Sequence, residues 1–345
     1  MFTAMADNRP LIALTIGDPA GVGPEIAARA LAESSTHELM RPLLVGDAEV
    51  MGQVVSGAEL DLDVRPIAAA DELSGEPGVV EVLDLDNVDD VTFGAVDPQC
   101  GRAAVAYIER ACELARDGDV DGIVTGPISK EAIKAGGSTF PGHTEMLADL
   151  LGVPEDDVVT MFALEQMRIF FLTRHHPLTA AIAQVTTERV HSGLVRVNEL
   201  LGELGVDSPR IALAALNPHA GENGILGSEE GDILEPAVEL ARADGVDVTG
   251  PVPADSVFWQ ARQGHYDGVI SLYHDQGHVA AKTVSFFGVV SVTLGLPVVR
   301  TAAEHGTAFD IAGRWIADPG GQLEAMRVAA ELAPVVRRVR AGASG

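Results

Sequence analysis

Three short apolar segments of the chain share one pattern, in which a run of strand-like residues leads directly into polar residues that include histidine. The runs are Ile169 to Thr173, Ile211 to Leu216 and Val269 to Tyr273, and a further run covers Val289 to Leu294. Continuous apolar runs of this length are typical of buried strands in a parallel sheet. Open parallel sheets bind ligands outside the carboxyl ends of their strands, so we expect a functional site there.

Helical patterns alternate with these runs along the chain. Apolar residues keep a helical spacing over 101–116, and Gly118 is a suitable stop for this helix. The same spacing predicts a second helix after the candidate cap Thr186 and a third over 229–243. Strands are also expected over 11–17, 43–45 and 122–125. The alternation predicts an α/β architecture with a mostly parallel sheet.

Two single residues predict local features. Asp47 follows a strand-like run and is a candidate N-cap for the next helix. Pro334 lies inside an amphipathic pattern at the carboxyl end, where we expect it to kink or interrupt the helix.

The three histidine-bearing strand ends suggest a metal site. His175, His219 and His274 follow the three runs, and they can converge at one rim if the strands share a sheet. Three imidazoles suit Zn, Mn, Co or Ni and leave a coordination position open for catalysis. The alternative is that each histidine is a satisfied polar residue at a strand end.

A second polar region follows the strand at 122–125. Residues 140–145 open a helix there, and backbone N–H groups at a helix start favour anions. His143 and Thr144 are therefore candidates for anion binding, with simple capping as the alternative. Lys130 is explained equally well as a solvated loop residue. The glycines in 17–25 match no phosphate-loop pattern, and a tight turn explains them equally well.

Composition narrows the range of partners. The formal net charge of -28 argues against nucleic acid, which needs a basic face. The 23 basic residues include only three lysines, Lys130, Lys134 and Lys282, and so acidic a surface fits adaptation to concentrated salt. The two cysteines predict no disulfide framework. No apolar run approaches the ~18 residues of a membrane span, and the first residues lack a secretory signal, so we expect a cytoplasmic protein without a membrane partner.

Seven ordered motifs closely resemble the 4-hydroxythreonine-4-phosphate dehydrogenase family, over about residues 11–319. They are GDPAGVGPE (17–25), GPISK (126–130), PGHTE (141–145), NPHAGE (217–222), YHDQGH (273–278), LGLPVVRT (294–301) and HGTAFDIAG (305–313). The last motif also resembles the cofactor loop of isocitrate and isopropylmalate dehydrogenases. The resemblance implies a two-lobed α/β/α fold with the active site in the cleft between the lobes. We expect residues 1–125 and 296–345 to form one lobe and residues 126–295 the other.

The resemblance also implies roles for individual residues. One divalent metal, with Mg added to the choices above, would be bound by His175, His219 and His274. The substrate would be bound by His143, Thr144, Lys282, Ser291 and Arg300, with Asp255, Asp275 and Lys282 as catalytic residues. NAD, or alternatively NADP, would be bound by His305, Gly306, Thr307, Ala308 and Asp310. The family's active site is shared across a homodimer, so both subunits would contribute ligands.

The expected reaction is the oxidation, with decarboxylation, of a 4-phosphorylated 3-hydroxy acid. Ser291 departs from the asparagine usual in the family, and the GENG, HDQGH and AFDIA variants resemble a branch acting on D-threonate or D-erythronate 4-phosphate rather than on 4-phosphooxy-threonine. The alternatives are a metal-dependent aldolase or hydrolase acting on a sugar phosphate, and a non-catalytic sugar-phosphate sensor. HGTAFDIAG argues against the first, and the absence of a recognisable DNA-binding segment argues against the second.

Overall fold

The computed structural model describes residues 8–76 and 78–343 of the chain, which divides into two compact units. Unit 1 consists of the chain up to Val158 together with Gly295–Arg337, and unit 2 of Val159–Leu294 with the residues from Arg338 onward. The sequence placed the first boundary at residue 125. Unit 1 continues beyond it because the two helices that follow, α5 (Lys130–Ala135) and α6 (His143–Leu150), pack on α4 (Pro98–Asp117) of the same unit.

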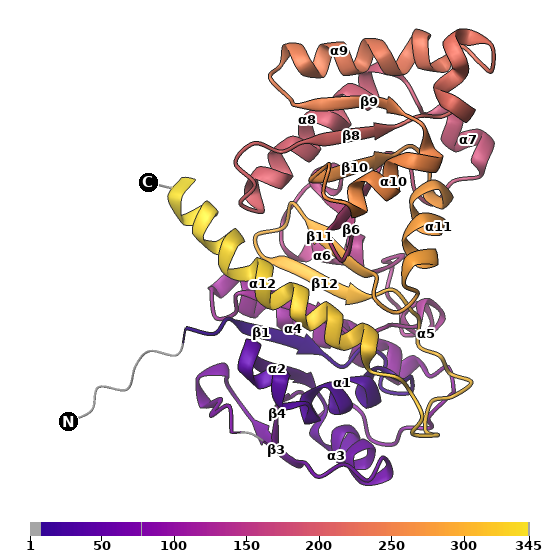
Figure 1. Cartoon of the computed structure of the whole chain (residues 1–345). Coiled ribbons are helices and arrows are strands. Elements are labelled where there is room, and N and C mark those ends of the chain that lie inside the picture. Colours follow the sequence, from indigo (N-terminus) through magenta and orange to yellow (C-terminus); the bar gives the residue numbers. More distant parts are fainter. Residues whose placement is uncertain (1–7, 77, 344–345) are drawn as a thin grey trace. The chain divides into compact units, whose positions relative to one another are not determined.

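Unit 1 is built on a parallel sheet with the strand order β3-β4-β2-β1-β5-β12 (Figure 1). The strands are β1 (Leu11–Thr15), β2 (Arg41–Gly46), β3 (Asp63–Ile67), β4 (Val79–Asp84), β5 (Gly122–Thr125) and β12 (Val299–Ala303). The helices are α1 (Gly23–Ala32), α2 (Ser34–Leu39), α3 (Ala48–Gly57), α4 (Pro98–Asp117), α5 (Lys130–Ala135) and α6 (His143–Leu150), with short 3-10 turns η1 (Ala70–Glu72) and η2 (Glu155–Asp157).

Unit 2 contains the strand order β11-β6-β7-β10-β8-β9, in which β6 is antiparallel to both of its neighbours and the other pairs are parallel. The strands are β6 (Val159–Leu164), β7 (Met167–Phe171), β8 (Ile211–Ala214), β9 (Val248–Val252), β10 (Gly268–Ser271) and β11 (Val290–Leu294). The helices are α7 (Leu178–Ala183), α8 (Thr187–Glu203), α9 (Glu235–Ala243), α10 (Ala254–Arg262) and α11 (His274–Val284), with η3 (Pro218–Gly224) and the π-helical turn η4 (Glu230–Leu234). The last helix, α12 (Gly320–Ala343), begins in unit 1.

The predicted α/β class is confirmed, and burial explains why the strands lie where they do. β5 and β10 are buried at every position, as expected for strands that are apolar up to their last residue. Cys100 and Cys112 are buried in α4, and loss of solvation raises the pKa of each thiol to about 12. Among the helices formed by the described residues, none combines the length and hydrophobicity that a bilayer crossing requires.

Three local predictions have different outcomes. Thr186 caps α8 as expected, since its hydroxyl accepts a hydrogen bond from Arg189 N at 3.2 Å. Asp47 occupies the N-cap position of α3 but does not cap it. Its carboxylate instead accepts hydrogen bonds from the Asn87 backbone and from the Tyr107 hydroxyl. The interruption expected at Pro334 is wrong, because α12 continues through that residue.

Candidate active site

The histidine-bearing segments leave neighbouring parallel strands of unit 2. Val269 of β10 is paired with Ile169 of β7 on one side and with Ala212 of β8 on the other. The three strands therefore run side by side in the same direction, and their carboxyl ends share one edge of the sheet. This arrangement is the one that the strand-like runs predicted.

His175 and His274 come together at this edge. Their ring centroids lie 5.7 Å apart, and both side chains line a cavity of about 260 Å³. The other residues that line it are Arg174, His176, Leu178, Ala181, Tyr273 and Asp275. Three imidazoles, those of His175, His176 and His274, and the carboxylate of Asp275 therefore border one hollow of unit 2.

The His274 ring is fixed on two sides. Its Nδ1 atom lies 2.6 Å from Oδ1 of Asp275, and its plane stacks on His278 with centroids 3.5 Å apart. His278 packs in turn against Phe162 at 4.4 Å between ring centroids, and loss of solvation lowers its pKa to about 4. A carboxylate on Nδ1 leaves Nε2 as the free ligand atom of His274, which is the usual arrangement around a metal-binding histidine.

Gln276 joins the elements behind this edge. Its side chain accepts a hydrogen bond from Leu272 N at 2.7 Å and donates one to the Ala215 carbonyl at 2.8 Å. The residue is buried and connects the end of β10 to the segment that leaves β8. The YHDQGH motif contains this glutamine, but the sequence assigned it no role.

The structure does not bring His219 into the same group. His219 is exposed on η3, and the described residues contain no set of three or more His, Cys, Asp or Glu close enough to hold a metal ion. A single copy of the chain thus assembles two of the three expected ligands. His219 lies on the backbone of η3, which has a left-handed conformation.

The remaining expected residues of unit 2 lie on three different elements. Asp255 is exposed in the first turn of α10. Lys282 lies in the last turn of α11, where its ammonium group is 5.5 Å from the Phe286 ring centroid. Ser291 is buried in β11, opposite Phe162 of β6.

Unit 1 contains a second polar centre, where the side chain of Arg300 from β12 reaches the carboxyl end of β5. Arg300 is only 5% exposed and donates from Nε to Oγ1 of Thr125 at 3.1 Å. Burial lowers its pKa to about 10, so the guanidinium stays charged at neutral pH. Lys130, at the start of α5, adds a second positive charge that acts on His143. The sequence left Lys130 unassigned, although the scarcity of lysine was a signal.

His143 is held as a neutral ring at this centre. Burial, Arg300 and Lys130 all lower its pKa well below the usual range. A hydrogen bond with the Gly126 backbone favours the protonated ring, so the carbonyl is the acceptor, and the buried Nε2 atom has no partner. Nδ1 is thus the donor, and Nε2 is left as a bare acceptor. Thr144 is the next residue of α6.

Asp18 is an unexpected buried acid in the loop after β1. It is fully buried, its Oδ1 accepts a hydrogen bond from Ala20 N at 2.9 Å, and its Oδ2 has no partner. Desolvation raises its pKa to about 6. In the sequence, Asp18 lies within residues 17–25, whose glycines a tight turn explained equally well.

The expected cofactor residues form a loop that packs on this same β1–α1 turn. Val22 N donates to the Thr307 carbonyl at 3.0 Å, and a Cβ atom at Gly21 would lie 3.0 Å from Cβ of Thr307. Ala308 has a φ of 42° and packs against an apolar cluster formed by Val22, Ile26, Ala312 and Ala317. His305, Gly306 and Asp310 lie on the same loop. The close approach explains why glycine stands at position 21.

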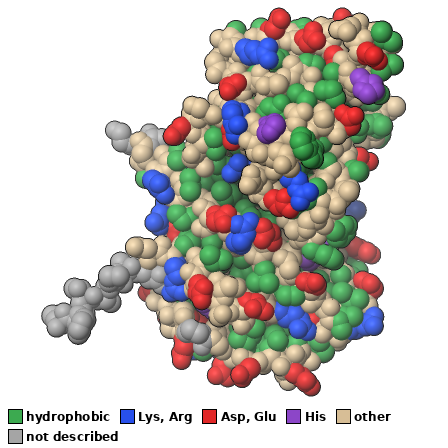
Figure 2. Space-filling model, in the orientation of Figure 1, with side chains coloured by type: hydrophobic (Ala, Val, Ile, Leu, Met, Phe, Trp, Pro, Cys, Tyr) green, Lys and Arg blue, Asp and Glu red, His purple; other side chains and the backbone are tan. Residues whose placement is uncertain are grey.

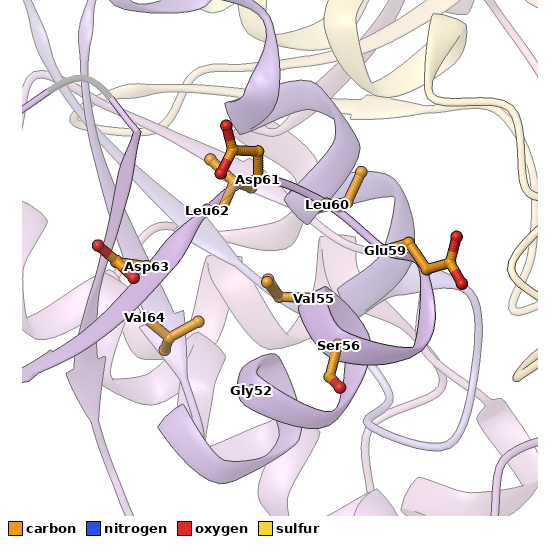
Figure 3. Close-up of a pocket in the computed structure, with 9 residues that line it drawn as sticks. All are labelled: Gly52, Val55, Ser56, Glu59, Leu60, Asp61, Leu62, Asp63 and Val64. Atoms are coloured by element: carbon orange, nitrogen blue, oxygen red, sulfur yellow. The ribbon is translucent and has the colours of Figure 1, made fainter.

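A larger hollow lies elsewhere in unit 1 and has unsuitable chemistry. Figure 3 shows this pocket of about 540 Å³ between the end of α3 and the start of β3, lined by Glu59, Asp61 and Asp63 together with apolar and small residues. Its lining contains three carboxylates and no basic side chain, so it would repel a phosphorylated ligand.

Comparison with known proteins places the chain in a family. The family model described as pyridoxal phosphate biosynthetic protein PdxA matches residues 38–329. A relative from Symbiobacterium thermophilum, provisionally named D-threonate 4-phosphate dehydrogenase, is 49% identical over 336 residues, which cover 97% of this chain and 100% of the relative. A similar relative from Halalkalibacterium halodurans, with the same provisional name, is 48% identical over 330 residues, 95% of this chain and 98% of the relative.

Solved structures agree with this placement. The crystal structure of a 4-hydroxythreonine-4-phosphate dehydrogenase from Burkholderia phymatum is 43% identical, with a TM-score of 0.84 over 94% of this chain and 99% of that one. The enzyme of the same name from Klebsiella pneumoniae is 37% identical, with a TM-score of 0.87 over 95% of this chain and 99% of that one. The chain therefore belongs to the PdxA family, that of the 4-hydroxythreonine-4-phosphate dehydrogenases.

Proposed function

We propose that the protein is an NAD-dependent and divalent-metal-dependent dehydrogenase that oxidises and decarboxylates a 4-phosphorylated 3-hydroxy acid. Relatives that are 48% and 49% identical are named for D-threonate 4-phosphate, so this compound and D-erythronate 4-phosphate are the first candidates, with 4-phosphooxy-threonine as the third. The observation that carries the proposal is the pairing of His175 with His274 beside Asp275 at one cavity.

The donor set of unit 2 fits a divalent metal. Neutral imidazoles are the commonest protein ligands of Zn, Mn, Co and Ni, and the carboxylate on Nδ1 of His274 orients the ring and increases its basicity. When bound, the ion supplies Lewis acidity at the hydroxyl oxygen of the substrate. His175 and His274 would hold it from one subunit.

His219 would come from the second subunit of a homodimer. One copy of the chain keeps this residue apart from the histidine pair, whereas a symmetric dimer repeats every surface and lets a second copy supply a missing ligand. The proposal thus accounts for three strand-end histidines of which only two meet within a chain.

Two of the proposed anion-binding cations, Arg300 and Lys130, belong to unit 1, and the third, Lys282, belongs to unit 2. A dianionic phosphate needs fixed cations in so acidic a chain, and the guanidinium of Arg300 can donate two parallel hydrogen bonds to it. We assign Arg300, Lys130 and Lys282 to the charge of the substrate and Thr144 to a hydrogen bond with it. The buried Ser291 has a shorter side chain than the asparagine usual in the family, and we assign it to selectivity among the hydroxy acids.

The tautomer of His143 suggests a separate role. A bare Nε2 acceptor repels phosphate oxygen and attracts a hydroxyl donor, since an acceptor pairs only with a donor. We therefore assign His143 to a hydroxyl of the substrate, which it orients and whose proton it can accept. Asp255 and Asp275 are assigned to the polar carbons of the substrate, and Asp275 also holds His274.

The loop that contains His305, Gly306, Thr307, Ala308 and Asp310 is assigned to NAD, which accepts the hydride when bound. The protein's contribution is a rigid support, because the β1–α1 turn packs directly under Thr307. NADP is the alternative cofactor.

A direct assay tests the reaction. Purified protein is mixed with Mn²⁺ or Zn²⁺, with NAD or NADP, and with a panel of the three phosphorylated acids and their unphosphorylated forms. We expect NADH and CO2 in equal amounts from one phosphorylated acid. NADH without CO2 would limit the reaction to oxidation, and cleavage of the substrate without NADH would replace the proposal with an aldolase or hydrolase.

Mixing two inactive variants tests the shared site. His219→Ala and His274→Ala are expected to be inactive alone. In a 1:1 mixture of exchanging dimers, each mixed dimer regains one intact site, so about a quarter of the wild-type activity should return. No recovery, with subunit exchange demonstrated by mass spectrometry, would place all ligands within one chain.

A further inference from the structure

The turn that carries His219 is wound in the left-handed sense. The φ angles of His219, Ala220, Glu222 and Asn223 are 53°, 52°, 44° and 56°, and Gly221 between them has a φ of 75°. A non-glycine L-residue is strained in this region, and such residues normally occur singly. Four of them in a row of five require a strong restraint from outside the turn.

The carboxylate of Glu230 provides that restraint from the next element along the chain. Glu230 is 3% exposed. Its Oε1 accepts hydrogen bonds from Leu216 N at 2.9 Å and Asn217 N at 2.7 Å, and its Oε2 accepts one from Asn217 Nδ2 at 2.9 Å. The chain is therefore fixed at the point where it leaves β8 and enters the turn.

The Asn217 side chain is fixed from a second direction. Its Nδ2 atom also donates to Oε2 of Glu229 at 2.7 Å. Both amide hydrogens are thus used, by two consecutive carboxylates. Glu230 is the first residue of the π-helical turn η4, and π-helical turns are rare and frequently lie at functional sites.

Two glycines make room for these contacts. A Cβ atom at Gly221 would lie 2.7 Å from Oε2 of Glu230, and one at Gly227 would lie 2.5 Å from Nδ2 of Asn217. Their φ angles of 75° and 131° are also unfavourable for other residues. The turn and its restraint therefore fit together as one unit, which we call the Asn217 clamp (Asn217, Glu229 and Glu230).

We propose that the Asn217 clamp is a positioning device, in which Glu230 holds the left-handed turn and thereby fixes the direction of the His219 imidazole. The clamp acts on an exposed turn, and the only metal-binding side chain in the turn besides the exposed Glu222 is His219. The role of His219 as a metal ligand rests on the proposed function, whereas the restraint of the turn by Glu230 does not.

The test compares Glu230→Gln with wild type and with Glu239→Gln as a matched control, since Glu239 is exposed on α9 and outside the clamp. In Glu230→Gln a side-chain NH₂ group would face the NH₂ group of Asn217, so at least one hydrogen bond is lost. Asn217→Ala is a second variant, which removes the amide and leaves both carboxylates.

Two quantities are measured on the full-length protein. Hydrogen exchange of the peptide containing residues 216–227 reports the turn, and titration of the metal-free protein with Zn²⁺ and Mn²⁺ reports the ligand. We expect both clamp variants to exchange faster in this peptide. We also expect them to bind metal at least ~10-fold more weakly, because mutation of the residues that support a metal ligand typically lowers the metal affinity by this much. The circular dichroism spectra of both clamp variants should match that of wild type. The control Glu239→Gln should match wild type in exchange and in metal affinity.

The outcomes separate this inference from the proposed function. Unchanged exchange in Glu230→Gln and Asn217→Ala refutes the clamp, whatever the metal does. Faster exchange with wild-type metal affinity, while His219→Ala abolishes binding, shows that the clamp is structural only and refutes the positioning role. A wild-type protein that binds no metal refutes the proposed metal dependence and the positioning role, while the exchange data still decide whether Glu230 restrains the turn.

Discussion

Arg300 donates a hydrogen bond from Nε to Oγ1 of Thr125 over 3.1 Å, so a nearly buried cation is given a fixed direction by a hydroxyl on the neighbouring strand. Burial, together with the same guanidinium and Lys130, lowers the pKa of His143 and keeps its ring neutral. A preoriented positive charge of this kind is what recognition of a phosphate or carboxylate requires.

Arg300→Ala and Lys130→Ala should each lower kcat/KM for the phosphorylated substrate at least ~10-fold, about 1.4 kcal/mol, because each removes a charge-assisted contact. Lys282→Ala should act in the same direction. Lys134→Ala, in the same helix as Lys130, is the control and should leave kcat/KM unchanged. Steady-state kinetics with the phosphorylated and unphosphorylated acids decide the matter, since an equal loss for both would contradict a phosphate-binding role.

Asp275→Asn should weaken metal binding by about 10-fold or more while leaving the fold intact. The amide accepts a hydrogen bond from His274 Nδ1 less strongly than the carboxylate does, so the ring loses orientation and basicity. Isothermal titration of metal-free protein measures the affinity. Asp207→Asn, an exposed acid of unit 2, serves as the control, and an affinity equal to wild type in Asp275→Asn would remove this carboxylate from the site.

Asp18 should make the protein less stable as the pH rises. Its pKa is 3.8 in the unfolded chain and about 6 when folded, so folding favours the protonated acid. That stabilisation is complete below pH 3.8 and is lost as the pH passes through about 6, by at most about 3 kcal/mol.

Asp18→Asn should remove this dependence, because an amide stays neutral. Urea unfolding at about pH 4.5 and about pH 7.5 measures the difference in the free energy of unfolding between the two conditions. The difference should shrink in Asp18→Asn and stay the same in Asp61→Asn, which alters an exposed acid of the same unit. Equal differences in all three proteins would show that Asp18 ionises normally.

Added KCl should raise the melting temperature. The chain has 51 acidic and 23 basic residues, and Figure 2 shows acidic side chains scattered over the visible face. Carboxylates spread in this way repel one another, and salt screens exposed charges beyond about 10 Å at 0.1 M. A melting temperature that stays flat or falls up to about 1 M KCl would assign the acidity another cause.

Apolar pattern was sufficient to predict the strands that carry the site. The runs ending near His175, His219 and His274 correspond to β7, β8 and β10, because buried parallel strands are marked by continuous apolar residues. Pattern could not predict η3. Ala220 and Glu222 within it are not typical of left-handed backbone, and the restraint comes from Glu230, which lies beyond the turn in the sequence.

Other differences have equally local causes. The helix through Pro334 persists because Ala333 and Val336 beside it are buried, and their packing offsets the lost backbone hydrogen bond. Asp47 looked like a cap, yet the Tyr107 hydroxyl, far along the chain, binds its carboxylate instead. Lys130 and Arg300 belong to one polar centre because β5 pairs with β12. The spacing of the motifs along the sequence does not predict this pairing.

The burial of both thiols in α4 gives the protein a built-in reporter. Neither Cys100 nor Cys112 can react with a maleimide or a disulfide reagent until α4 opens, and the chain contains no other cysteine. The rate of labelling under native conditions therefore measures the opening of unit 1 alone. Adding Zn²⁺ or NAD during labelling would then reveal, without any mutation, which ligand stabilises that half of the protein.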